Sequence, residues 1–151
     1  MNGTRHTLSK DERLNKKKAI DALFGGGNLS FAAYPFRAVF QATSREDVAV
    51  RILVSIPKHR LRHAVDRNRM KRLAREVYRM NKDILTNTAD ELNCTVNIAF
   101  ICISNNVATY REVQKSITRI LQRTAEALVK RSKKDVPKND GQEQIGSSSP
   151  Q

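Results

Sequence analysis

The side chains best suited to a chemical task are basic ones gathered in a single segment, residues 58–79. Inside it, the run "HAVDRNRMKRLAREVYR" (63–79) holds only two acids, Asp66 and Glu76. Guanidinium and ammonium groups bind phosphate through charge-assisted hydrogen bonds, so this composition predicts contact with a phosphate backbone. The candidate binding residues are Lys58, Arg60, Arg62, Arg67, Asn68, Arg69, Lys71, Arg72, Arg75 and Arg79.

The whole chain carries the same positive bias. Its 151 residues contain 28 Lys+Arg against 15 Asp+Glu, a formal net charge of +13. This balance indicates an anionic partner, either nucleic acid or an anionic membrane surface. No apolar run is long enough to cross a bilayer and no signal-peptide pattern is visible, so we expect no membrane partner and a cytoplasmic location. Cys94 and Cys102 fit that compartment as unpaired thiols.

A catalytic centre for phosphodiester hydrolysis is not evident in the sequence. Such a centre in a protein usually needs a metal-binding carboxylate cluster or a pair of histidines. His59 and His63 belong to the loop that leads into the basic helix and are interpreted as neutral loop donors. The adjacent acid pairs all fall in expected caps or loops: Asp11-Glu12, Glu46-Asp47 and Asp90-Glu91. We therefore expect no catalytic residue and no metal site, with a protein-only endonuclease kept as one alternative.

A helix must position the basic side chains. Asp66 fits its N-cap, Val65 and Met70 fit a hydrophobic staple, and the helix is predicted to run to about Lys82. The apolar residues share one side, at about 100° per residue: Met70, Leu73, Ala74, Val77 and Met80. The basic residues then form a ridge on the other side. A solvated face normally mixes both signs, so this ridge favours an anionic partner.

The composition of this basic ridge favours RNA over DNA or a membrane as the partner. A helix that reads the DNA major groove presents side chains to base edges, whereas this ridge is almost entirely Arg and Lys. Recognition of backbone and shape suits structured RNA better. A helix lying on a membrane would need its apolar side at the surface, and here that side is needed for the core. We therefore expect neither DNA nor a membrane as partner.

The other elements predict one mixed α/β domain. A capping box at Ser9–Glu12 predicts a helix that runs to Phe24, and another at Thr109–Glu112 starts the last helix. The strands expected are 34–42, 48–56 and 94–103, with a weak one at 29–32. The polar link 43–47 predicts an antiparallel hairpin between the first two of these, and 83–93 is interpreted as a polar loop that partly extends the basic helix.

These elements assemble into a two-layer sandwich with the helices on one face of the sheet. The other face would carry Arg51, Ser55 and Asn97, which suit the floor of an open cleft. The stripe that faces the sheet from the last helix is Val113, Ile117, Ile120, Leu121 and Leu128. Residues 9–131 form the expected domain, 1–8 a flexible N-terminus and 132–151 a disordered polar tail.

Several segments resemble a known family. "RNRMKRLARE" (67–76) resembles the RNR signature of the bacterial ribonuclease P protein subunit. "RLNKKKAIDALFGGG" (13–27), "LVSIPK" (53–58) and "TYREVQKSITRILQR" (109–123) are similar to other parts of it. The resemblance implies an α-β-β-β-α-β-α fold with a central four-stranded sheet and the RNR helix on a left-handed crossover. It also implies a catalytic ribonuclease P RNA as partner, which with Mg²⁺ removes the 5′ leader of precursor tRNA.

The same resemblance implies a cleft between the first helix and the sheet that holds this leader. The cleft residues that it implies are Lys17, Ile20, Phe24, Phe40, Arg51 and Ser55. Ile20 stands where the family has an aromatic, which predicts weaker stacking on the leader. Core packing is the alternative for Phe24 and Phe40. The loop 57–63 departs from the family by Pro57, an added residue and Arg62-His63. The rival interpretation is a ribosomal or general structured-RNA-binding protein without a role in cleavage.

Overall fold

The computed structural model describes residues 8–26 and 28–140, with side chains described as far as Ser132. The predicted flexible N-terminus therefore lies outside the described residues except for Leu8. No helix in the described ranges is both long and apolar enough to span a membrane. In chain order the elements are the 3₁₀ helix η1 (Lys10–Glu12), α1 (Lys17–Phe24), β1 (Leu29–Ala33), β2 (Phe36–Ser44), β3 (Val50–Ser55), α2 (Ala64–Asn81), α3 (Asp83–Glu91), β4 (Cys94–Cys102) and α4 (Tyr110–Asp140).

The four strands form one sheet in the order β1-β2-β4-β3. β1 with β2 and β2 with β4 are antiparallel, whereas β3 and β4 are parallel and joined by a crossover through α2 and α3. The predicted hairpin between β2 and β3 is therefore wrong, because β4 lies between them. An inner position suits β4, because it is buried on both of its faces and its backbone groups pair with β2 along one edge and with β3 along the other.

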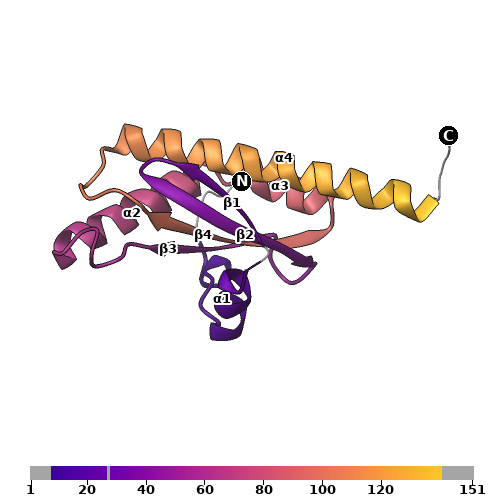
Figure 1. Ribbon diagram of the computed structural model, residues 1–151, viewed down its shortest axis with the longest axis horizontal. Helices are drawn as coiled ribbons and strands as arrows, with labels where there is room; N and C mark the ends of the chain where they lie inside the picture. Colours follow the sequence, from indigo (N-terminus) through magenta and orange to yellow (C-terminus); the bar gives the residue numbers. More distant parts are fainter. Residues whose placement is uncertain (1–7, 27, 141–151) are drawn as a thin grey trace.

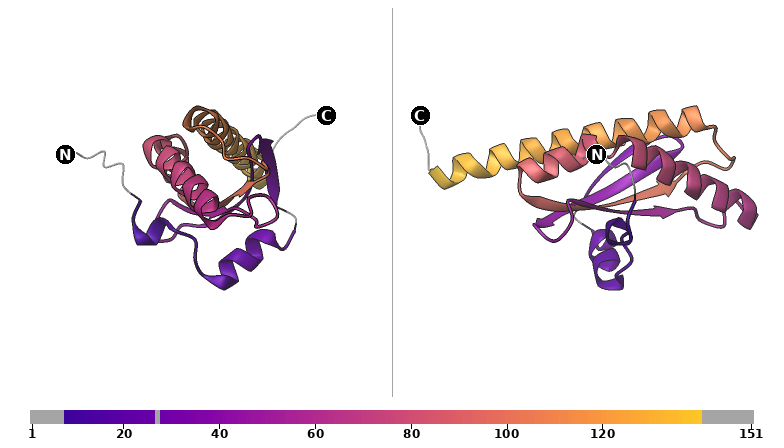
Figure 2. Two further views of the ribbon diagram at one scale, coloured as in Figure 1. Left: turned by 90° about the vertical axis from the view of Figure 1, so that its left-hand side faces the viewer. Right: turned by 180° about the vertical axis from the view of Figure 1, so that it is seen from behind.

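Helices cover both faces of the sheet, not one as predicted. Figures 1 and 2 show α2, α3 and α4 on one face and α1 on the other. The main core lies under the three helices and includes Phe36, Ile98 and Ile117. A second, smaller cluster lies under α1 and consists of Leu14, Leu23, Val39 and Ala99. The face that was expected to be an open floor is thus partly closed.

The chain before α1 is not the continuous helix that the first capping box predicted. Ser9 and Glu12 cap only η1, with the Ser9 N–H donating to Glu12 Oε1 at 2.9 Å. The backbone then extends, and the Leu14 N–H donates to the carbonyl of Ile52 on β3 at 2.7 Å. This pairing buries Leu14 and lays the segment along the outer edge of β3. Burial of Leu14 and a strand-type hydrogen bond thus replace the helical turn.

The basic helix is present, but it begins three residues before the predicted first helical position. α2 starts at Ala64 with His63 as N-cap, so Asp66 lies in the first turn and is not the cap. Val65 is 77% exposed, so the predicted hydrophobic staple is also wrong. The Arg67 N–H donates to the carbonyl of His63 at 3.1 Å, which starts the helical ladder early. Asp66 still stabilises the positive end of the helix dipole from its place in the first turn.

The last two helices complete the main core. The expected polar loop 83–93 mostly forms α3, because Leu85 and Ala89 are spaced four apart and both are buried. The second capping box is confirmed: the Glu112 N–H donates to Thr109 Oγ1 at 3.2 Å. The whole predicted stripe of α4 is buried, from Val113 to Leu128. α4 continues through residues 132–140, which the sequence assigned to the tail, and residues 141–151 lie outside the described part.

Candidate nucleic-acid interface

A basic ridge runs along the outward side of α2. The helix buries Met70, Ala74, Val77 and Tyr78 fully against the core, so its orientation is fixed. Met80, predicted on the apolar side, is 47% exposed, and Tyr78 takes its place because it points inward against Phe100. The polar side chains left on the outward side are Asn68, Arg69 and Arg72, which are exposed, and Lys71 and Arg75, which are partly exposed.

On α2, the predicted phosphate-binding residues Arg67 and Arg79 already have partners in the protein. Arg67 Nη1 donates to the carbonyls of Leu61 and Arg62, at 2.9 and 2.8 Å, and so holds the loop before α2. Arg79 Nη2 pairs with Glu76 Oε2 at 2.7 Å, and this hydrogen bond raises the pKa of Arg79 and lowers that of Glu76. These two side chains therefore offer less free charge than the sequence suggested.

A hollow of about 470 Å³ lies between α2 and the chain before α1. Its lining brings Arg13 beside Arg72, Arg75 and Arg79, with Glu76 as the only acid. Burial, together with the charge of Arg13, lowers the pKa of Arg75, which means that its cation is poorly compensated by the protein. Sequence reasoning missed Arg13, because it placed that residue inside a helix and not on an extended segment beside β3.

The basic loop 57–63 extends the ridge. β3 and β4 are parallel, so the loop after β3 and the turn after β4 lie at the same end of the sheet (Figure 1). Arg60 Nη1 donates to Asn105 Oδ1 at 3.3 Å across that end, and Lys58 and Arg62 remain exposed. Tyr34 is 64% exposed nearby, with its hydroxyl donating to Ser104 Oγ at 2.9 Å. One continuous basic surface thus joins the loop to α2.

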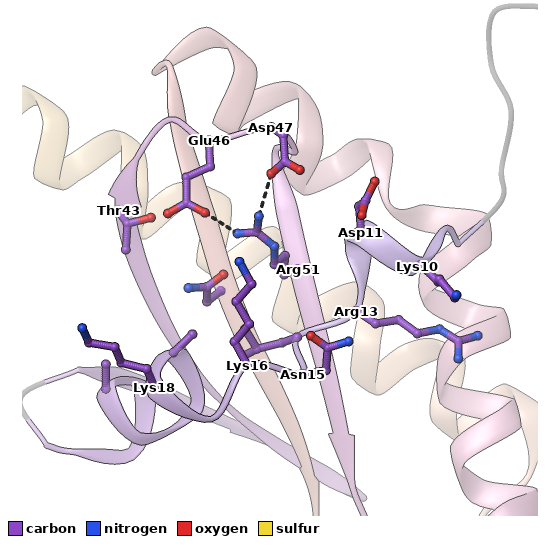
Figure 3. Close-up of a pocket in the computed structure, with 14 residues that line it drawn as sticks. Lys10, Asp11, Arg13, Asn15, Lys16, Lys18, Thr43, Glu46, Asp47 and Arg51 are labelled. Carbon is purple, nitrogen blue, oxygen red and sulfur yellow. Dashed lines mark hydrogen bonds and ion pairs between the residues drawn. The ribbon is translucent and has the colours of Figure 1, made fainter.

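A second hollow, of about 520 Å³, lies on the opposite face between the chain around α1 and the sheet (Figure 3). Arg51 of β3 lines it and pairs with Glu46 and Asp47 at 2.7 and 2.6 Å. Asn97 of β4 also lines it, as do Lys16 and several other polar residues. We call this hollow the α1 cleft. Its lining comprises Lys10, Asp11, Arg13, Leu14, Asn15, Lys16, Lys18, Ala19, Ala22, Thr43, Glu46, Asp47, Arg51 and Asn97.

The predicted cleft residues are only partly brought together. Arg51 lines the α1 cleft, whereas Lys17, Phe24 and Ser55 lie outside its lining, Lys17 and Phe24 on α1 and Ser55 on the same sheet face. Phe24 is 46% exposed at the end of α1. Ile20 is partly buried and packs against the second cluster.

Phe40 lies away from the α1 cleft. It is fully buried in the main core, where its ring stacks on Phe31 with centroids 5.7 Å apart. Successive residues of a strand point to opposite faces, so Val39 and not Phe40 faces α1. Core packing, the alternative considered for Phe40, is what the structure shows.

The described part of the chain contains no group of three or more His, Cys, Asp or Glu side chains that could hold a metal ion. Cys94 and Cys102 are unpaired, and burial raises the pKa of both thiols, which disfavours a reactive thiolate. What this geometry can do is bind phosphate on one face and hold a small polar ligand on the other.

Comparison with known proteins gives consistent results. A family model described as Ribonuclease P matches residues 8–125. The "Ribonuclease P protein component" of Porphyromonas gingivalis strain W83 is 41% identical over 119 residues, which cover 78% of this chain and 86% of that protein. The protein of the same name from Chlorobium phaeobacteroides is 29% identical over 127 residues, covering 77% and 86%.

Solved structures share the fold at lower identity. The RNase P protein of Staphylococcus aureus superposes with a TM-score of 0.58 at 20% identity, covering 75% of this chain and 94% of that one. The RNase P protein of Thermotoga maritima has the same TM-score and identity, covering 74% and 96%. These two likenesses support the arrangement of the sheet and helices.

Proposed function

The chain belongs to the ribonuclease P protein family, and we propose that its α2 ridge binds the catalytic RNA while the α1 cleft receives the 5′ leader of precursor tRNA. It is a ribonuclease P protein subunit, a component of an endoribonuclease that processes tRNA. The catalytic centre of that holoenzyme lies in its RNA, and the protein works together with this RNA.

The observation that supports this division of roles is the placement of charge on two faces. The exposed arginines and lysines of α2 and of the loop 57–63 form a surface without enough acids to compensate it. Arg69, Lys71 and Arg72 lie within about one turn of α2, so an external anion would offset their mutual repulsion. RNA phosphates supply that anion in the docked state.

The chain's own residues then bind and orient. Arg72 and Arg75 would contact phosphates of the catalytic RNA, while Lys16 and Lys18 would hold the leader backbone at the α1 cleft. Magnesium, bound mainly by the RNA, supplies the charge stabilisation that phosphodiester hydrolysis needs. The protein raises local affinity for the substrate and lowers the magnesium concentration that cleavage requires. The cytoplasmic location stays a prediction.

Reconstitution tests the proposal. The full chain is mixed with a bacterial ribonuclease P RNA and a precursor tRNA at low magnesium, and cleavage and affinity for the leader are measured. Both the cleavage rate and the affinity should rise when the chain is added. Arg72→Ala should reduce this increase, whereas Arg119→Ala, which changes an exposed side chain on α4, should not. A chain that binds RNA without raising cleavage would support the general RNA-binding rival. Cleavage by the chain without RNA would support a protein-only endonuclease.

A further inference from the structure

One exposed tyrosine is anchored by a buried serine. Tyr34, in the turn between β1 and β2, is 64% exposed, whereas Ser104 is only 2% exposed. The Tyr34 hydroxyl donates to Ser104 Oγ at 2.9 Å. That Oγ also donates to the carbonyl of Asn106 at 2.8 Å and accepts from the Asn106 N–H at 3.1 Å. Water could satisfy a solvated tyrosine hydroxyl, so this chain of hydrogen bonds does more than pair a polar group: it fixes the direction of an exposed ring.

Cations surround this tyrosine. Arg60 Nη1 donates to Oδ1 of Asn105, the residue directly after Ser104, so Arg60 and Tyr34 contact neighbouring residues of one turn. Lys58 and Arg62, on the same loop as Arg60, are exposed. The three segments that meet at this end of the sheet contain no acid in their sequence: 33–37, 55–63 and 102–108. An exposed aromatic ring is thus combined with local positive charge.

The position of Tyr34 in the fold separates it from the α1 cleft. Phe36, at the start of β2, pairs with Cys102, whereas Thr43, which lines the α1 cleft, lies near the other end of β2. At the rise of a strand, these two residues of β2 are about 23 Å apart. The loop after β3 and the start of α2 lie at the Phe36 end (Figure 1). Tyr34 therefore adjoins the basic surface of the loop and α2, and it is remote from the cleft proposed for the leader.

This combination suits an unpaired nucleotide. Proteins that bind single strands stack the bases on aromatic rings and hold the backbone with cations. Every base has a π face, so stacking requires an unpaired base but not a particular one. Because Ser104 already fixes the ring of Tyr34, stacking on it costs little side-chain entropy. The surrounding cations without neighbouring acids favour RNA over another protein as the partner.

We propose that Tyr34 is a stacking site for one unpaired base of the catalytic RNA, with Lys58, Arg60 and Arg62 holding the adjacent phosphates. The inference rests on the proposed function, since it takes the catalytic RNA as the partner of this basic surface. It adds a contact that does not depend on charge. Stacking on Tyr34 would position an unpaired segment of the RNA against the end of the sheet.

A fluorescence titration tests the stacking directly. The chain contains no tryptophan, so Tyr34→Trp introduces a single indole at this site. Catalytic RNA, added without precursor tRNA, should quench its fluorescence, because a stacked base quenches indole. Leu29→Trp is the matched control, since Leu29 is 42% exposed at the start of the same strand, away from the turn that holds Tyr34. This control variant should bind the RNA equally well and keep its fluorescence.

The salt dependence of affinity separates stacking from phosphate contact. Tyr34→Ala should weaken binding of the catalytic RNA by about 5- to 100-fold, with an unchanged slope of log affinity against log salt, because stacking releases no counterion. Lys58→Ala should instead reduce that slope by about one. Tyr34→Phe keeps the ring and loses only the anchor, so its affinity should stay within about threefold of the unaltered protein. Full affinity in Tyr34→Ala, or an equal loss in Tyr34→Phe, overturns the proposal.

The fluorescence result also separates this inference from the proposed function. If the indole is quenched only after precursor tRNA is added, the base belongs to the substrate and the inference is wrong. If catalytic RNA alone quenches it but the unaltered chain does not stimulate cleavage, the proposed function fails and the stacking site stands. If cleavage is stimulated but the bound catalytic RNA leaves the fluorescence unchanged, the proposed function stands and this inference fails.

Discussion

At the scale of single residues, Arg67 and Arg72 differ in what their guanidinium groups contact. Arg67 donates to the carbonyls of Leu61 and Arg62, whereas Arg72 is exposed beside a basic hollow. We expect Arg67→Ala to lower the free energy of unfolding by about 2 kcal/mol, because two charge-assisted hydrogen bonds are lost. Arg72→Ala should change it by less than about 0.5 kcal/mol. Denaturant titration measures both.

Measurements of RNA binding should also distinguish Arg72→Ala from Arg67→Ala. Arg72→Ala should reduce the slope of log affinity against log salt by about one, as expected for one lost phosphate contact. An unchanged slope would contradict a phosphate role for Arg72. Arg67→Ala should weaken RNA binding mainly through the loosened loop before α2, so its loss in affinity should exceed what its change in slope explains.

Tyr78 provides a prediction about alkaline pH. Its hydroxyl is buried without a hydrogen-bond partner among the described residues, and burial raises its pKa above the ordinary value, with smaller effects from Glu12 and Asp83. The folded state therefore keeps a proton that the unfolded chain releases above about pH 10, so this contribution to stability is constant below that pH and falls as pH rises further. Tyr78→Phe should remove the fall and raise the free energy of unfolding at neutral pH by about 1 kcal/mol. Chemical denaturation at pH 7 and pH 10.5 measures both effects, and a loss of stability at pH 7 would show that the hydroxyl has a partner.

The sequence identified residue types on the basic side well, but not which of them already have protein partners. The ridge followed from helical spacing alone, because apolar and basic side chains separate on one wheel. The role of Arg67 depends on backbone carbonyls whose direction is set by the loop, and spacing contains no information about that. Phe40 shows the same limit: an aromatic on a strand faces either side, and only the position of α1 decides which side is the cleft.

At the scale of elements, an ion pair attaches the chain before α1 to Lys82, which lies between α2 and α3. Lys82 Nζ lies 2.9 Å from Glu12 Oε2, and both side chains are mostly buried. Glu12→Gln removes the carboxylate from a mostly buried ion pair, so it should lower the free energy of unfolding by about 2 kcal/mol. It should also speed hydrogen exchange of the Leu14 amide, which donates to Ile52.

Asp21→Asn is the control for this element, because Asp21 is an exposed acid on α1. It should change neither stability nor exchange at Leu14. If Glu12→Gln behaves like Asp21→Asn, the ion pair does not hold the segment. The sequence did not predict this contact, because it predicted a single helix from Ser9 and because Glu12 and Lys82 are 70 residues apart.

At the scale of the whole molecule, the large positive net charge affects the stability of the fold. A net charge of +13 on a chain of this size repels itself in the folded state. We expect the free energy of unfolding to rise as salt is added from about 0.01 M to about 0.15 M, because the Debye length then falls from about 30 Å to about 8 Å. Urea denaturation at several chloride concentrations measures this. Constant stability over that range would show that the repulsion is already compensated within the protein.

The overall class of fold was predictable, but the sheet order was not. Periodicity predicted α2 and the main strands, and a capping box predicted the start of α4, since these signals are local in sequence. The parallel pairing of β3 with β4 depends on a crossover through two helices, which local sequence signals do not show. The short polar link 43–47, considered alone, predicts a hairpin between β2 and β3. The second cluster under α1 also could not be predicted, because it requires the break in the first helix.

The pairing of Arg13 and Leu14 with β3 has one more consequence, for solubility. β3 has β4 on one side, and this short segment covers its other edge. If the segment detached, the strand "VRILVS" would present unpaired N–H and C=O groups beside β-branched side chains, the kind of edge that recruits other chains. We therefore expect the Glu12–Lys82 pair, by holding this segment in place, to protect the RNA-free chain against self-association.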